Sequence, residues 1–137
     1  MQQYIGAIDQ GTTSTRFIIF DTNGAIIGST QLEHKQHFPF PGQVEHNPEE
    51  IWKNTETVIS ETLAKTGIRS SQILGIGITN QRETIVPFNP KTGQLYYNAI
   101  VWQDLRGAAF IEECKTRMEE SLLREKTGLL WSPYFSG

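Results

Sequence analysis

The sequence predicts an α/β fold with a mixed sheet, and this expectation depends on three observations. Three short apolar runs lie close together at the start of the chain, separated by polar turns. A helix with a clear start signal follows, and after it comes a wholly apolar run, residues 73–78. Strand, helix and strand in this order are typical of an α/β crossover. We therefore expect a meander of three strands, joined by a fourth strand and flanked by helices.

The three runs that open the chain are residues 4–8, 17–20 and 25–32. Each is rich in β-branched or aromatic residues, which favours strands. Asn23 and Gly24 tolerate positive φ, so they predict a hairpin turn between the second and the third strand.

Residues 47–50, Asn-Pro-Glu-Glu, predict the start of a long helix. Asn is a favoured N-cap, Pro fits the first helical position and Glu the third. The helix is expected to end at Gly67. Its apolar face comprises Ile51, Trp52, Thr55, Val58, Ile59, Thr62 and Leu63. The run at residues 73–78 is apolar throughout, so we expect a central strand there.

Residues 33–47, which precede this helix, predict irregular structure because they contain two prolines and a glycine. The stretch also holds all three histidines, His34, His37 and His46. No cysteine or acidic residue completes a recognised metal-binding spacing with them. We interpret them as solvated loop residues.

The last third of the chain predicts a strand and then helices. A turn at residues 89–93 precedes an expected strand at residues 95–102. Helical spacing then relates Ala108, Ile111, Cys114, Met118 and Leu122, and Gly128 ends a final helical turn. Cys114 lies on this stripe and is interpreted as a packing residue. The end of the chain, residues 133–137, does not resemble a finished terminus, so we expect an incomplete domain.

Composition limits the class of protein. The chain has 137 residues, 37% of them hydrophobic and 20% charged, which is typical of an ordinary globular domain. A net charge of −3 gives no argument for nucleic acid or an anionic membrane as partner. The single cysteine fits a reducing compartment, and no apolar run reaches the length of a membrane span. The cytoplasm is the expected location.

Residues 9–16, Asp-Gln-Gly-Thr-Thr-Ser-Thr-Arg, connect the first two predicted strands. Gly11 would let the backbone approach an anion closely, and the hydroxyl groups add hydrogen-bond donors. Asp9 is suited to Mg²⁺ or its bound waters. The pattern thus suggests a metal and a phosphate held side by side. An ordinary hairpin with a hydrophilic turn fits the composition equally well.

A second polar cluster, residues 79–84, follows the apolar run at residues 73–78. Arg82 can donate hydrogen bonds and Glu83 can accept them, which suits a small polyhydroxyl ligand in a cleft. The alternative is a charged and solvated bend between strands. The pattern favours neither interpretation over the other.

Five motifs together resemble the FGGY carbohydrate kinases, which have the ribonuclease-H-like (actin-like ATPase) fold. The motifs are Asp9 to Ser14, Val44 to Pro48, Gly77 to Thr84, Ala99 to Asp104 and Pro133 to Gly137. The resemblance covers the whole chain, but residues 1–137 correspond only to the N-terminal part of that family's first domain, without the second domain. Leu105 and Gly107 depart from the family's basic residues at this point, and the resemblance assigns no role to Arg106.

The resemblance implies phosphorylation of glycerol to glycerol 3-phosphate by ATP and Mg²⁺. The nucleotide phosphates would be lined by Gly11, Thr12, Thr13 and Ser14, with Arg16 close by and Asp9 near the Mg²⁺. Arg82, Glu83 and Tyr134 would hold the glycerol hydroxyls, and Trp102 would wall the carbon backbone. The catalytic base would be an Asp beyond Gly137. The full-length protein would be a homo-oligomer.

Two further functions remain open at this point. A kinase for another polyol or a ketose would keep the loop at Asp9 but change the set Arg82, Glu83 and Tyr134. A binding module could also use the same fold without catalysis.

Overall fold

The computed structural model describes residues 2–135, and its internal contacts divide the chain into two units. Unit 1 comprises Met1–Lys35 and Asn47–Gln81, and unit 2 comprises Gln36–His46 and Arg82–Gly137. The chain thus leaves unit 1, contributes a short segment to unit 2, returns to unit 1, and ends in unit 2. No helix of the described residues has the length and the apolar character that crossing a membrane requires.

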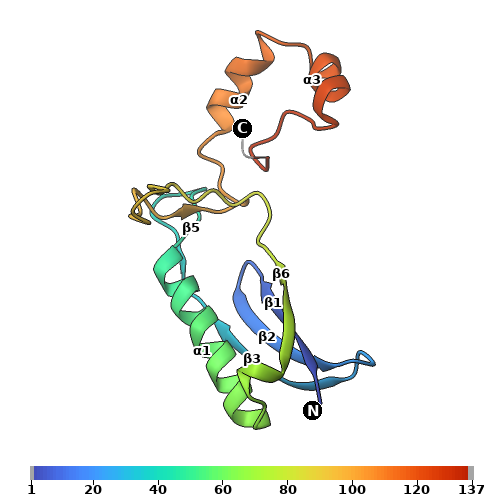
Figure 1. The fold of residues 1–137 in the computed structure, drawn as a ribbon. Helices are drawn as coiled ribbons and strands as arrows, with labels where there is room; N and C mark the ends of the chain where they lie inside the picture. Colours follow the sequence, from blue (N-terminus) through green and yellow to red (C-terminus); the bar gives the residue numbers. More distant parts are fainter. Residues whose placement is uncertain (1, 136–137) are drawn as a thin grey trace. The chain divides into compact units, whose positions relative to one another are not determined.

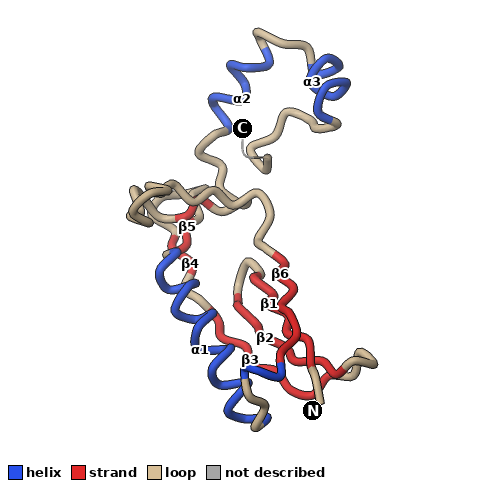
Figure 2. The backbone as a smooth tube through the Cα atoms, viewed as in Figure 1, coloured by secondary structure: helices blue, strands red, loops and turns tan. Residues whose placement is uncertain are grey.

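Unit 1 contains a four-stranded mixed sheet (Figures 1 and 2). Its strands are β1 (Tyr4–Gln10), β2 (Ser14–Asp21), β3 (Ile26–Glu33) and β6 (Ile73–Thr79), in the order β3-β2-β1-β6. β1, β2 and β3 are antiparallel neighbours, and β6 pairs with β1 in parallel. The predicted meander and crossover are therefore confirmed. The turn between β2 and β3 is closed by the Asp21 carboxylate, which accepts from the N–H groups of Asn23 and Ala25.

Helix α1 (Pro48–Thr66) begins and ends where the sequence predicts. Asn47 Oδ1 accepts a hydrogen bond of 2.9 Å from the N–H of Glu49, as an N-cap does. Gly67 ends the helix with φ of 68°, a left-handed conformation that favours glycine. α1 packs on β2 and β3 (Figure 1). Trp52 was predicted on the packed face, but 65% of its surface is exposed.

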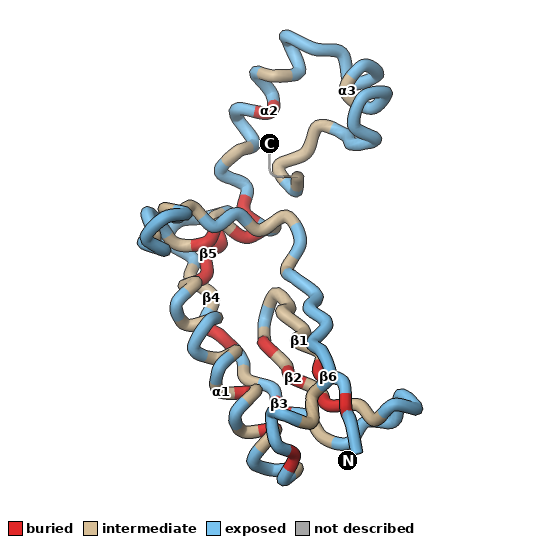
Figure 3. Tube along the Cα trace, viewed as in Figure 1, coloured by how far each residue is buried: buried red, intermediate tan, exposed pale blue. Residues whose placement is uncertain are grey.

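The core of unit 1 is apolar and lies between α1 and the sheet, and its buried positions are visible in Figure 3. Its buried members are Tyr4, Phe17, Ile19, Val58 and Ile68. Gly6 on β1 makes this packing possible, because a Cβ atom there would lie 2.8 Å from the ring of Phe17. The ring can lie against the strand only where no side chain intervenes.

The expectation that residues 73–78 form a central strand is wrong for the described residues. They form β6, which follows a short 3-10 helix, η1 (Ser70–Gln72), and is an edge strand of the four-stranded sheet. Leu74, Ile76 and Ile78 on this strand are exposed. A run of apolar residues indicates that a strand can be buried on both faces, but it does not reveal whether a neighbouring strand lies on each side.

Unit 2 contains a small antiparallel sheet of three two-residue strands, in the order β4-β5-β7. The strands are β4 (Gln36–His37), β5 (Glu45–His46) and β7 (Ala99–Ile100). The prediction that residues 33–47 are irregular is therefore wrong in part, because β4 and β5 pair there. His34 and His46, expected in solvent, are buried.

The expected strand at residues 95–102 is much shorter in the structure. Only β7 is a strand, and an isolated bridge pairs Leu95 with Phe88. The strand ends because the N–H of Asp104 donates back to the carbonyl oxygen of Val101 at 2.8 Å, which starts a turn. The turn at residues 89–93 is confirmed, with the Asn89 side chain accepting from the N–H of Lys91 and Gly93 at φ of 74°.

The helical part of unit 2 forms two short helices, α2 (Ala108–Lys115) and α3 (Glu120–Thr127). The single stripe predicted from Ala108 to Leu122 is therefore interrupted between them. Ile111 is the buried residue of α2, and Cys114 is only half-buried. Gly128 ends α3 in the left-handed conformation, as predicted.

Candidate functional site

The first candidate site is the turn between β1 and β2, residues 11–13, in unit 1. The N–H of Gly11 donates to the carbonyl oxygen of Ser14 at 3.0 Å, which closes the turn. Gln10 lies beneath it: its amide donates to the Gly11 carbonyl oxygen, and its Oε1 accepts from the Thr15 hydroxyl at 2.6 Å. Residues 9–16 thus form a hairpin turn, as one of their two interpretations predicts. A hairpin of this kind still presents N–H groups and hydroxyls in a small space.

His34, just after β3, also binds this turn. Its Nε2 lies 2.8 Å from the carbonyl oxygen of Thr12, and its backbone N–H donates to the carbonyl oxygen of Thr13 at 3.1 Å. Because a carbonyl oxygen only accepts, Nε2 carries the proton in this contact. Sequence reasoning missed this residue. The available signal was its place at the end of the third predicted strand, on the side where the first turn lies.

Arg16 and Ser14 are held together by Gln31 of β3. Arg16 donates twice to Gln31 Oε1, at 2.9 and 2.6 Å, and Gln31 Nε2 donates to the Ser14 hydroxyl at 3.0 Å. Asp9 pairs in register with Arg16 on β2 and with Thr79 on β6. Asp9, Ser14 and Arg16 therefore lie at the same end of the unit 1 sheet.

The residues at this end of the sheet fit a magnesium ion that also binds phosphate. Asp9 is half-buried and supplies a carboxylate where β1 ends. Mg²⁺ usually keeps several waters and is bound through one or two carboxylates together with substrate phosphates. No group of three or more potential metal-ligating side chains occurs among the described residues, so an all-protein metal cage is not found there.

The second candidate site lies in unit 2, where the structure brings Trp102 and Tyr134 together. Their ring centroids are 5.4 Å apart in an edge-to-face arrangement, and Phe135 packs on Tyr134 at 5.0 Å. Such pairs are a favourable aromatic geometry. The polar tip of Tyr134 and the face of Trp102 thus come from segments 32 positions apart in the sequence.

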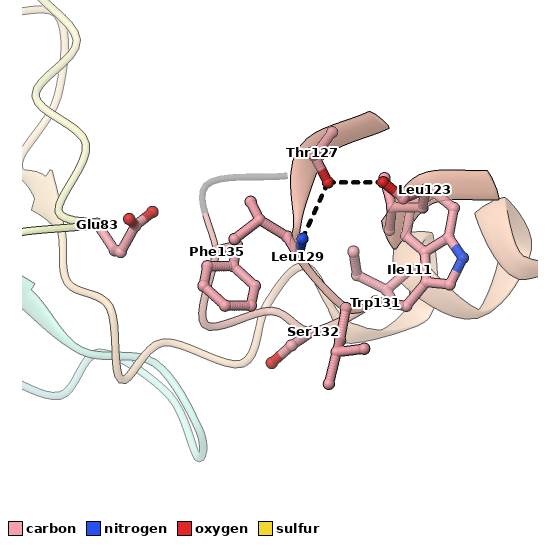
Figure 4. A pocket seen from close by; sticks show the side chains of 9 residues that line it. Glu83, Ile111, Leu123, Thr127, Leu129, Trp131, Ser132 and Phe135 are labelled. Atoms are coloured by element: carbon pink, nitrogen blue, oxygen red, sulfur yellow. Dashed lines mark hydrogen bonds between the residues drawn. The ribbon is translucent and has the colours of Figure 1, made fainter. Parts of the chain in front are cut away.

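Glu83 is the one non-glycine residue with positive φ among the described residues, at 60°. Such a conformation costs on the order of 1–3 kcal/mol and persists only when the surroundings impose it. Glu83 lines a cavity of about 270 Å³ together with residues of α2, α3 and the following segment (Figure 4). Its neighbour Arg82 is exposed and does not line this cavity. The exposure of Arg82 fits both the solvated bend and a ligand contact at the surface, whereas Glu83 is half-buried at a cavity.

Arg106, to which the family resemblance assigns no role, forms a charged cluster with two buried carboxylates. Its Nη2 lies 2.7 Å from Glu45 Oε1 and 2.8 Å from Asp104 Oδ2, and both carboxylate side chains are 2% exposed. Tyr97 and Asn98 also donate to Glu45, each at 2.9 Å. Asp104 Oδ2 also accepts from the N–H of Val44 at 2.7 Å, and Oδ1 accepts from the backbone N–H and the Nε of Arg106, each at 2.8 Å. The cluster thus fastens residues 44–46 to residues 97–106.

The charges in this cluster are mutually stabilised. Burial raises the pKa of Glu45, but hydrogen bonds from Arg106, Asn98 and Tyr97 outweigh it, so the pKa lies below its ordinary value. Burial likewise raises the pKa of Asp104, and the bonds from Arg106 and from backbone N–H groups lower it overall. The hydrogen bond to Asp104 raises the pKa of Arg106 further above the neutral range. All three groups are therefore ionised at neutral pH.

The chain is similar to a known protein family and to relatives of known name. Residues 4–137 match the N-terminal domain of the FGGY family of carbohydrate kinases. The chain is 55% identical over its full length to a glycerol kinase of Rhizobium meliloti, of which it spans 28%.

Solved structures agree with that match. A crystal structure of Plasmodium falciparum glycerol kinase with ADP superposes with a TM-score of 0.91 at 35% identity, covering 98% of this chain and 27% of the other. Gluconate kinase from Lactobacillus acidophilus superposes with a TM-score of 0.87 over 98% of this chain and 26% of the other; at 24% identity this likeness shows the fold alone.

Proposed function

Because this chain belongs to the FGGY family of carbohydrate kinases, we propose that the protein transfers a phosphoryl group from ATP to glycerol, giving glycerol 3-phosphate. The observation that carries the proposal is the 55% identity to a glycerol kinase over every residue of the chain. Since the chain spans 28% of that relative, the activity is that of the full protein. Residues 1–137 would supply the phosphate loop and part of the glycerol site.

Unit 1 would hold the nucleotide. Phosphoryl transfer asks a protein mainly for positioning and for neutralisation of charge. Gly11 and the hydroxyls of Thr12, Thr13 and Ser14 would contact the phosphates, and the guanidinium of Arg16, fixed beside Ser14 by Gln31, would add positive charge. Asp9 would bind Mg²⁺ or its waters at the end of β1. Bound Mg²⁺ would neutralise charge on the phosphates.

Unit 2 would hold the alcohol. Glu83 would accept hydrogen bonds from glycerol hydroxyls, Arg82 would donate to them, and the Tyr134 hydroxyl could do either. Trp102, packed edge-to-face on Tyr134, would cover the carbon backbone. The strained backbone of Glu83 supports its assignment, because strain of this kind gathers at binding sites. The base that accepts the hydroxyl proton would be an Asp outside residues 1–137.

Two properties of the full protein complete the proposal. The single cysteine, Cys114, supports a reducing compartment, for which the cytoplasm is the natural choice. Homo-oligomerisation of the full protein is expected from the family resemblance. Residues 1–137 would form the first part of the first domain of the full protein.

Two substitutions in the full protein encoded by the gene test the proposal. Arg82→Ala should weaken the use of glycerol by roughly ten- to a hundred-fold, since a hydrogen bond to a charged group contributes about 1.5–3 kcal/mol. Its effect on the KM for ATP should be small. Asp9→Asn is nearly isosteric and should lower turnover most at limiting Mg²⁺. The assay is glycerol-dependent formation of ADP.

Lys91→Ala is the matched control, because Lys91 is an exposed cation in the turn after Asn89. A wild-type protein that phosphorylates another polyol or a ketose faster than glycerol would refute the substrate assignment. Equal damage to glycerol and ATP use in Arg82→Ala would mean that Arg82 is structural.

A further inference from the structure

The β1–β2 turn has a regular arrangement of carbonyl groups that the motif does not explain. The carbonyl oxygens of residues 11–14 each accept a hydrogen bond from within unit 1. Gly11 accepts from the Gln10 amide, and Ser14 accepts from the N–H of Gly11. Thr12 and Thr13 both accept from His34, one from the ring and one from the backbone.

This arrangement matters because a carbonyl oxygen repels an anion. In a planar trans peptide the C=O of one residue and the N–H of the next point in opposite directions. Once His34 holds the carbonyl oxygens of Thr12 and Thr13, the N–H groups of Thr13 and Ser14 point away from His34. Converging N–H groups are what an anion-binding concavity needs. His34 thereby fixes the orientation of two consecutive peptide planes in the turn.

His34 is also well placed to be rigid. It is 6% exposed, and it follows β3 directly, so its backbone extends the β2–β3 ladder by one hydrogen bond. The ring contact to Thr12 is short, at 2.8 Å, and bridges 22 positions of sequence. A buried side chain held at both its backbone and its ring loses little further freedom when a ligand binds.

We propose that His34 is a positioning residue of the nucleotide site: its ring Nε2–H holds the Thr12 peptide so that the following N–H groups face a bound phosphate. The inference rests on the proposed nucleotide role of unit 1. It concerns the affinity for a nucleoside diphosphate or triphosphate with Mg²⁺, and it assigns no contact between His34 and the substrate itself.

The test compares three variants of the full protein by titration with MgADP in a calorimeter. His34→Phe keeps a ring of similar size but removes the donor, and it should weaken MgADP binding by about five- to a hundred-fold, the effect of taking this donor from the part-buried carbonyl oxygen of Thr12. His34→Gln keeps an N–H donor on a flexible side chain and should recover most of that loss. His37→Phe is the matched control, since His37 pairs in β4 and not with the turn, and it should bind as the wild type does.

Steady-state kinetics separate positioning from a general loss of structure. His34→Phe should raise the KM for ATP while the KM for glycerol stays within about twofold, because the Thr12 contact touches only the nucleotide side. If the affinities for MgADP and glycerol fall together and His34→Gln restores neither, His34 is a structural residue and the inference is wrong. Unchanged MgADP affinity in His34→Phe would also overturn it.

A measurement on the wild type covers the case in which His34→Phe does not fold. Amide NMR should show that MgADP shifts the N–H signals of Thr13 and Ser14 more than those of residues in β3, and smaller shifts there would refute the inference. The proposed function can fail separately. A wild type that binds MgADP with these amide shifts, yet does not phosphorylate glycerol, would keep the role of His34 and remove glycerol as the substrate.

Discussion

The two units hold their candidate sites by different physical means. Unit 1 rests on an apolar core, centred on Phe17, Ile19 and Val58, beneath a ladder of backbone hydrogen bonds. In unit 2 the strands are two residues long, and Glu45 and Asp104 are as buried as the apolar residues around them. Arg106 supplies the charge that makes this burial tolerable.

This difference shows what each site can be built from. In unit 1 the candidate phosphate contacts are largely backbone groups and short hydroxyls, which strands and turns place accurately. In unit 2 the candidate contacts are long side chains, Glu83 and Tyr134 among them, on a segment with little regular structure. A charged cluster replaces the missing ladder there, because hydrogen bonds to ionised groups are stronger and more directional than neutral ones.

Removing the cation should break unit 2 while leaving unit 1 intact. Arg106→Met keeps much of the side-chain volume but leaves two buried carboxylates without their partner, which costs about 3–5 kcal/mol. We expect this loss in the local free energy of unfolding measured by hydrogen exchange at Val101. The same measurement at Ile19 should hardly change.

Lys115→Met is the control for this experiment, because Lys115 pairs with Glu112 on the surface of α2. Exposed pairs of this kind contribute about 0.2–1 kcal/mol. A loss no larger than this in Arg106→Met would show that the buried cluster does not stabilise unit 2.

Adding one methyl group to β1 should destabilise unit 1 by less than Arg106→Met destabilises unit 2. Gly6→Ala would place Cβ 2.8 Å from the Phe17 ring, and overpacking of this kind costs about 1–3 kcal/mol. Gly77→Ala on β6 is the control, since no atom lies within 4 Å of the Cβ position there. The free energy of unfolding of both variants is measured by chemical denaturation and by hydrogen exchange at Ile19. Equal stability of the two variants would contradict the close packing of Phe17 on β1.

The start of α1 offers a smaller effect that is also confined to unit 1. Asn47→Ala removes the side-chain acceptor of the Glu49 N–H and should cost about 1 kcal/mol. Asn47→Asp keeps an acceptor oxygen, so it should retain most of that stability. Thermal unfolding and exchange of the first amides of α1 provide the measurement. An equal loss in both variants would mean that the cap does not stabilise α1.

Mild acidification should have the smallest effect, and it should affect the units unequally. The pKa values of Glu45 and Asp104 are lowered in the folded protein, so their contribution to stability is fully present above the unfolded values, about 4. That contribution is lost as pH falls below about 4, through the lowered native values. Little should therefore change down to about pH 5.

Further acidification should expose the difference between the units. The buried members of the unit 1 core contain no carboxyl group, so amide exchange should accelerate at Val101 of unit 2 before it does at Ile19. Arg106→Met should remove this difference in amide exchange, because Glu45 and Asp104 then lack the guanidinium that stabilises their ionised form. Unit 1 losing protection first would refute the charge-based account of unit 2.

The sequence predicts the parts of this fold that local rules determine. Asn47 and Pro48 start α1, and Gly67 ends it, because capping depends on residues within a few positions of each other. The meander follows from short apolar runs and turn residues for the same reason. The edge position of β6 was not predictable in this way, since sheet order depends on segments that are distant in sequence.

The sites follow the same division. Asp9, Ser14 and Arg16 are neighbours in sequence and remain neighbours in the structure. Their roles as ligands stay predictions. The pairing of Glu45 with Arg106 spans 61 positions, and no local pattern connects them. The strained backbone of Glu83 was equally unpredictable from the sequence. Its positive φ is imposed by the surroundings and is disfavoured by the residue itself.

The interrupted path of the chain has a consequence for synthesis on the ribosome. Every strand of unit 1 precedes residue 80, whereas Glu45 of unit 2 waits 61 positions for Arg106. At about 5–20 residues per second, this delay lasts roughly 3–12 s. The nascent chain can complete unit 1 while residues 36–46 remain an open loop with an ionised glutamate. Translation speed between residues 46 and 106 thus sets how long that loop stays accessible to proteases and chaperones.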